Sequence, residues 1–144
     1  MTIAEAYRRA QSCVDGFWAK SDETVEEMYP QMADMQREQM YRGEKALGIP
    51  IVPPYTLYTV YIKTAKGQPT DRVTLKDTGA FYEGIYVERN GKELVFDSTD
   101  EKTSDLKEKY GESIFGLQKE NYEHLSEEWT NKMTEWAKKT ILNE

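Results

Sequence analysis

The stretch that decides the fold is Gln68–Phe96, QPTDRVTLKDTGAFYEGIYVERNGKELVF. It contains the dipeptide Asn90-Gly91, which is the pair most typical of a two-residue turn between antiparallel strands. A type I′ turn needs positive φ at both central residues, and Asn and Gly adopt that conformation at low cost. The stretch therefore predicts a β-hairpin over about residues 81–98.

The position of the turn sets the expected register. With Arg89 paired to Lys92, four apolar side chains share one face of the hairpin and pair across it, Val87 with Leu94 and Ile85 with Phe96. Glu88 and Glu93 then share the other face, because successive side chains of a strand alternate. One face of the hairpin is expected to pack on a core and the other to meet solvent.

Helices are predicted upstream of this hairpin. Over residues 2–20 apolar side chains recur every three or four positions, and Thr2 with Glu5 has the spacing of a capping box. A second helix is expected over about residues 22–42, where Pro30 either kinks the helix or lies in its true first turn.

The rest of the chain predicts an extended arm and more helix. Within residues 49–66, the prolines at the start of the segment exclude a helix there. From Thr56 onward, the same segment is expected to form a short helix. A further short helix is expected over 103–110, and a long C-terminal helix over about 118–141. The predicted fold class is α+β: one domain over residues 1–144, with helices packed on a small, mainly antiparallel sheet.

Composition narrows the function classes. The chain of 144 residues is 38% hydrophobic and 31% charged, with a net charge of −7, yet it has three Trp, ten Tyr and four Phe. Its basic residues form no patch, which argues against binding to a nucleic-acid backbone, including sequence-specific binding. The absence of a long apolar run or a leader argues against a membrane span and favours synthesis in the cytoplasm. We expect part of the aromatic surface to be buried against partner subunits.

The triplet Asp77-Thr78-Gly79 matches the active-site sequence of aspartic proteases, in which two carboxylates share one proton. With one copy in the chain, a homodimer would have to supply the second carboxylate. Lys76 argues against this interpretation, because a neighbouring cation lowers the pKa of a carboxylate. We favour a turn leading into a strand, in which Gly79 supplies a permissive backbone.

No residue cluster predicts a cofactor or a metal. Cys13 is the only cysteine and His124 the only histidine, so neither a Cys/His pair nor a soft-metal site is supported. The acidic residues that follow the hairpin lack the ligand spacing of a calcium loop. We expect no catalytic, cofactor-binding or metal-binding residues.

Aromatic residues are the candidate interface residues. Tyrosines behind a Pro-rich segment favour a docking surface, because phenol groups are tolerated at wet interfaces. The tryptophans of the C-terminal helix are interpreted first as core and second as interface. The candidates for a subunit interface are Tyr55, Tyr58, Tyr61, Trp129 and Trp136.

Four segments in order carry a family resemblance: Gln36–Gly43 (QREQMYRG), Pro53–Tyr55 with Thr59 and Lys63, Gly67–Tyr82 (GQPTDRVTLKDTGAFY) and Lys109–Leu117 (KYGESIFGL). Through these four segments, which span about residues 36–125, the chain resembles the neck or tail-completion proteins of tailed bacteriophages. Those proteins join the head of the particle to its tail. These are related to the virion morphogenesis proteins of Mu-like prophages. Members of this family have no active site and assemble as rings.

The resemblance implies a structural protein of the virion neck or tail, with the portal-side connector and the tail-tube proteins as partners. A ring through which DNA passes is expected to have an acidic lumen, since negative charge repels phosphate. The candidate lumen residues are Glu88, Glu93, Asp97, Asp100 and Glu101. Two alternatives remain open. One is a small cytosolic acidic binding module, such as an immunity or anti-host protein, and the other is a dimeric aspartic protease.

Overall fold

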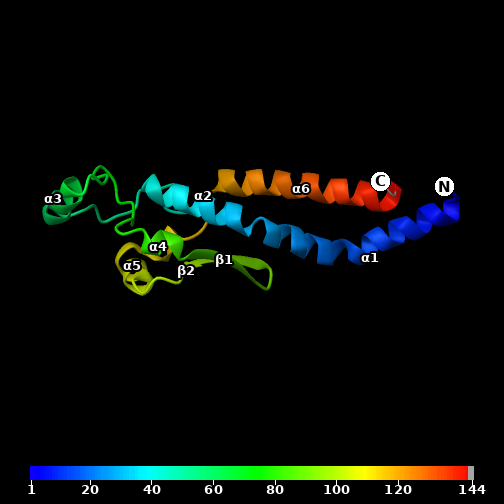
Figure 1. Ribbon diagram of the computed structural model, residues 1–144, viewed down its shortest axis with the longest axis horizontal. Helices are drawn as coiled ribbons and strands as arrows, with labels where there is room; N and C mark the ends of the chain where they lie inside the picture. The colour runs from blue at the N-terminus through cyan, green and yellow to red at the C-terminus, as the bar shows by residue number, and fades with distance from the viewer. Residues whose placement is uncertain (143–144) are drawn as a thin grey trace. The chain divides into compact units, whose positions relative to one another are not determined.

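The computed structural model describes residues 1–142 and has the predicted α+β fold (Figure 1). Its elements follow in chain order: α1 (Ile3–Glu27), α2 (Tyr29–Tyr41), α3 (Leu57–Ala65), α4 (Ala80–Glu83), β1 (Ile85–Asn90), β2 (Glu93–Ser98), α5 (Thr103–Tyr110), the 3-10 turn η1 (Glu112–Ile114) and α6 (Lys119–Leu142). The chain divides into two compact units. The helix-pair unit contains residues 1–28 and 122–142, and the sheet unit contains residues 29–121.

In the helix-pair unit, α1 and α6 run antiparallel. Arg9 donates to the carbonyl oxygen of Ile141 at 3.4 Å, and the indole N–H of Trp129 donates to Ser21 Oγ at 3.2 Å. The ring of Trp129 also meets Phe17 edge to face, with 6.2 Å between the ring centroids. The predicted capping box is present: Thr2 Oγ1 accepts from the Glu5 N–H, and Glu5 accepts from the Thr2 N–H.

The first helix is longer than predicted. It continues past residue 20 to Glu27, although Ser21 and Asp22 are residue types that often begin helices. Ser21 and Thr24 are buried, and the Thr24 hydroxyl donates to the Lys20 carbonyl at 2.7 Å within the helix. Packing against α6 therefore overrides the local preference. The second helix, α2, begins at Tyr29 and has Pro30 in its first turn. This is one of the two arrangements predicted for Pro30; the other was a kink within a longer helix.

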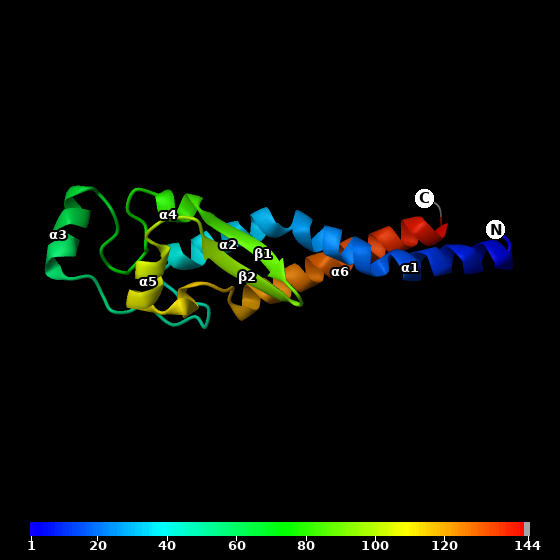
Figure 2. The same cartoon turned by 90° about the horizontal axis from the view of Figure 1, so that it is seen from below.

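In the sheet unit, the hairpin packs along α2 (Figure 2). The guanidinium group of Arg37 on α2 donates to the carbonyl oxygens of Tyr82 and Ile85, at 2.8 and 3.3 Å. These two bonds tie the start of β1 to the helix. The core beneath the hairpin consists of buried apolar residues that include Met40, Phe81, Val87, Phe96 and Ile114.

The hairpin is present, but its predicted register is wrong by two residues. Asn90 pairs with Glu93, so Val87 faces Phe96 and Ile85 faces Ser98. Gly91 has φ +65°, and in residues 1–142 the only non-glycine residue with positive φ is Leu75, which excludes a type I′ turn. The loop is Gly91-Lys92, with Gly first. Because the shift is even, each side chain keeps its predicted face.

The start of the predicted hairpin is also wrong. Residues 80–83 form the short helix α4 instead of strand, and Phe81 is buried from that helix. Gly79 precedes α4 with φ +96°, so the glycine is required by a turn that leads into a helix.

Two glutamines of α2 hold residues 114–118 in place, a contact that sequence reasoning did not identify. Gln36 and Gln39 are fully buried. The Gln36 amide donates to the Ile114 carbonyl at 3.1 Å and accepts from the Gly116 N–H at 2.7 Å. The Gln39 amide donates to the Gly116 carbonyl at 2.9 Å and accepts from the Gln118 N–H at 2.7 Å. The two side chains thus replace the backbone partners that a neighbouring strand would supply.

Candidate functional site

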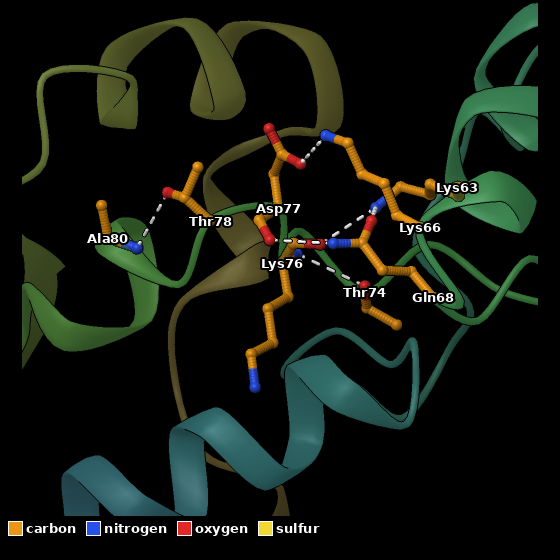
Figure 3. A network of polar contacts seen from close by, with 8 residues as sticks. All are labelled: Lys63, Lys66, Gln68, Thr74, Lys76, Asp77, Thr78 and Ala80. Atoms are coloured by element: carbon orange, nitrogen blue, oxygen red, sulfur yellow. Dashed lines mark hydrogen bonds and ion pairs between the residues drawn. The ribbon is translucent and has the colours of Figure 1, made fainter.

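The loop around the Asp-Thr-Gly triplet is held by a network of polar contacts (Figure 3). Lys63 on α3 is buried and donates to the Lys76 carbonyl at 2.9 Å and to Gln68 Oε1 at 3.3 Å. Gln68 in turn donates to the Asp77 carbonyl at 2.9 Å. The triplet is therefore fixed mainly through its backbone, by side chains that come from α3 and the turn after it.

The carboxylate of Asp77 forms an ion pair with Lys66, with 2.9 Å between Nζ and Oδ1. The hydrogen bond from Lys66 is the main cause that lowers the pKa of Asp77 below its ordinary value, and partial burial opposes it. A lowered pKa keeps this carboxylate ionised at neutral pH. The proton-sharing pair of an aspartic protease needs the opposite shift in one carboxyl group.

The ion pair leads to a prediction about pH. Since folding lowers the pKa of Asp77, its contribution to stability is present above about pH 5 and is lost as the pH falls below about 4. About half of each side chain is exposed, so we expect Asp77→Asn to lower the free energy of unfolding by less than about 1 kcal/mol at pH 7. At pH 3 the difference between the two proteins should be smaller than at pH 7, because part of the carboxylate is then protonated. Urea denaturation at both pH values measures the difference, and a larger loss at pH 3 than at pH 7 would contradict this.

A cavity of about 230 Å³ lies beside the triplet. Its lining has charges of both signs, from Lys63, Lys76 and Lys102 and from Asp77 and Asp100. Ligand pockets usually measure about 300–1,000 Å³ and are mostly apolar. This cavity is smaller than that and charges of both signs line it, so it provides little support for a small-molecule site.

The three candidate interface tyrosines differ in their surroundings. Tyr55 is half-buried: its hydroxyl accepts from the Thr74 N–H at 2.9 Å, and Lys63 lies over its ring. Tyr58 and Tyr61 on α3 are 74% and 75% exposed, and Leu57 beside them is 89% exposed. Leu57 was not among the predicted residues. Sequence reasoning gave the helix and two of the exposed side chains, Tyr58 and Tyr61.

Trp129 and Trp136 lie within the helix-pair unit and are half-buried there. Trp129 contacts Phe17 and Ser21, and the ring of Trp136 lies near Gly16. Both tryptophans thus contribute to the contact between α1 and α6. The exposed tryptophan of this unit is Trp18, which is 74% exposed.

The five candidate lumen residues are divided between two settings. Glu88, Glu93 and Asp97 share one face of the hairpin by the pleat of its strands. Asp97 forms an ion pair with Lys107 at 3.2 Å, and Asp100 accepts from the Lys102 N–H at 3.4 Å. The side chains of Glu88, Glu93 and Glu101 are exposed. The structure thus leaves three of the five carboxylates on the open surface.

Within residues 1–142 no group of three or more His, Cys, Asp or Glu side chains has a metal-binding arrangement. Cys13 is half-buried in α1, and His124 is exposed on α6. Among the helices described, none combines the length and the apolar character needed to cross a membrane.

Comparisons of the chain with protein-family models, with curated proteins and with solved structures found no significant match. Functional inference therefore depends on the geometry of the described residues and on the resemblance in sequence.

Proposed function

We propose that this chain is a structural subunit of the neck or tail-completion region of a tailed-bacteriophage particle. It assembles with copies of itself into a ring that joins the head to the tail and lets DNA pass. The portal-side connector and the tail-tube proteins are its neighbours in the virion. The protein acts through its surfaces and carries out no reaction.

The observation that carries this proposal is the outer face of α3. Leu57, Tyr58 and Tyr61 lie on one side of this helix and are each about three-quarters exposed or more. The helix has no acidic residue, and its Lys63, like Lys66 directly after the helix, bonds to the loop that follows. An uncharged aromatic face of this kind is typical of the central part of a protein interface.

The contact between α2 and residues 114–118 gives further support. Gln36 and Gln39 belong to one segment that carries the resemblance, and Ile114 and Gly116 belong to another. Segments 75 or more residues apart in the chain are thus joined by direct hydrogen bonds.

The proposal is tested by the mass of the assembly. Light scattering after size-exclusion chromatography would be measured for the chain alone and mixed with the portal and tail-tube proteins of a tailed bacteriophage. We expect a closed oligomer, alone or in the mixture, visible as a ring by electron microscopy. A monomer that binds neither protein would overturn the proposal. A one-to-one complex with a basic protein would support the acidic binding module instead.

The α3 face leads to a specific prediction. We expect Tyr58→Ser/Tyr61→Ser to weaken ring formation at least tenfold, because the two side chains present roughly 250–350 Å² of mostly apolar surface. The matched control is Tyr58→Phe/Tyr61→Phe, which keeps the aromatic area and should assemble normally. The circular dichroism spectra of both variants should match that of the unmodified chain, since the exposed rings support no fold contact. Normal assembly of the serine variant would remove α3 from the interface.

A further inference from the structure

An apolar stripe runs along α1 on a side of the helix that α6 does not cover. It consists of Ile3, Tyr7, Ala10, Val14 and Trp18, and is called the α1 stripe below. At 100° per residue these five positions lie within about 80° of one another around the helix. Along the same stretch of the helix, the residues that meet α6, such as Arg9 and Gly16, lie on the opposite side.

The α1 stripe is large for a surface that stays in water. Tyr7 is 69% exposed, Trp18 74%, Val14 68% and Ile3 91%. With aromatic side chains of roughly 150–250 Å², the stripe presents about 450–500 Å² of apolar area. Two such stripes in contact would remove about 900–1,000 Å² from water. This is near the lower limit of about 1,000 Å² for a specific interface.

The spacing of the stripe matches a second copy of itself. We propose that two copies of the chain pair through their α1 stripes in an antiparallel arrangement. A twofold axis between Ala10 and Gln11 places Ile3 of one copy opposite Trp18 of the other, and Tyr7 opposite Val14. The small Ala10 lies at the crossing point, where the helices approach most closely.

The charges beside the stripe select the antiparallel arrangement. Arg8 and Asp15 flank the stripe on the same side. In an antiparallel pair, Arg8 of one copy lies within about half a helical turn of Asp15 of the other. In a parallel pair, this flank of one helix and the same flank of the other lie on opposite sides of the contact, so Arg8 and Asp15 could not pair.

This pairing goes beyond the proposed ring. A symmetric contact joins two copies and is then complete, whereas a ring that joins a head to a tail needs head-to-tail contacts. The pair is therefore a state of the free chain. It covers the α1 stripe until the subunit meets its neighbours.

Sedimentation equilibrium of the full-length protein tests the pairing. It is measured on the Tyr58→Ser/Tyr61→Ser variant, so that the α3 contact of the proposed ring does not contribute to the mass. We expect this protein to form dimers in the micromolar range. Adding Tyr7→Glu and Val14→Glu should raise the dissociation constant at least 100-fold, because the charges would face each other across the axis.

The control carries two glutamates on the opposite side of α1, Ser12→Glu and Ala19→Glu, where both residues are exposed. It has the same added charge and should dimerise normally. Helical content and thermal stability are measured for every variant, and a glutamate variant that has lost its helical content is replaced by Trp18→Ser. A protein that stays monomeric at 100 µM would overturn the pairing, as would a dimer that keeps its affinity with the stripe substituted. Either result would leave the ring proposal standing.

Disulfide formation tests the orientation. In a Cys13→Ser background, a mixture of the Ile3→Cys and Trp18→Cys proteins is oxidised. We expect the mixed disulfide to form at least tenfold faster than either homodimer disulfide. Faster formation of the homodimer disulfides would contradict the antiparallel arrangement.

Discussion

Replacing Gln36 with Leu is expected to lower the free energy of unfolding of the sheet unit by about 2–4 kcal/mol. Leucine has a similar volume, but it cannot pair with the Ile114 carbonyl or the Gly116 N–H, which Gln36 meets at 3.1 and 2.7 Å. The Ile114 carbonyl and the Gly116 N–H would both lose their hydrogen-bond partner in a part of the protein that water reaches poorly. The cost of an unsatisfied buried group exceeds the value of the hydrogen bond itself, and this explains the size of the effect.

The matched control is Gln31→Leu on the same helix. Gln31 is partly exposed and is not one of the glutamines that bond to residues 114–118, so its replacement should change stability by about 0.5 kcal/mol or less. All three tryptophans, Trp18, Trp129 and Trp136, lie in the helix-pair unit. Tryptophan fluorescence would therefore miss the effect, and amide hydrogen exchange at residues 114–118 should be measured. Unchanged protection there would contradict the role given to Gln36.

The second large effect is expected from Gly84→Ala. This glycine lies between α4 and β1 with φ −78°, a conformation that any residue adopts, so backbone strain is not the reason. An added Cβ would approach Ser98 Oγ to 2.6 Å and Thr99 Oγ1 to 2.8 Å, which is closer than real contacts allow. The Thr99 N–H also donates to the Gly84 carbonyl, so the two segments cannot separate freely. We expect a loss of about 2–3 kcal/mol, measured by urea denaturation followed by circular dichroism.

Gly16→Ala provides a control of the opposite sign. Gly16 is inside α1, and an added Cβ would lie 3.6 Å from the nearest atom of Trp136, which is ordinary contact. Alanine favours a helix over glycine by about 1 kcal/mol, so the variant should be slightly more stable. Here tryptophan fluorescence is the right measurement, because Trp136 lies in the same unit. If Gly84→Ala and Gly16→Ala changed the free energy of unfolding equally, the room available for the added Cβ would not be what determines the effect on stability.

The parts of the fold that local chemistry dictates could be predicted from the sequence. The capping box of Thr2 and Glu5, Pro30 in a first turn and the helical spacing after Thr56 are each set within a few residues, and each is found in the structure. The C-terminal helix followed from its apolar period. The predicted end of the first helix failed because it depends on distant contacts. The extension of α1 through Ser21 and Thr24 depends on α6, which begins about a hundred residues later.

The candidate site was harder to predict for the same reason. A pattern shows that a helix has an apolar side, but not which side its partner covers. In α1 the partner covers Phe17 together with small residues such as Gly16, while Tyr7 and Trp18 stay outside. Gln36 and Gln39 gave no signal either, since glutamine is common on exposed helical surfaces. Two glutamines three positions apart, within an otherwise apolar side of a helix, are the pattern that would have indicated buried amides.

The bonds of Gln36 and Gln39 have a consequence for the particle proposed above. A carboxamide does not ionise in the range where carboxylates and amines do, and dissolved salt screens it far less than it screens an ion pair. The hydrogen bonds between α2 and residues 114–118 should therefore be about equally strong at low and at high salt concentration. The Lys66–Asp77 ion pair, in contrast, should weaken as salt is added. A virion component that passes from the crowded host interior to the open environment would keep this part of its structure through the change.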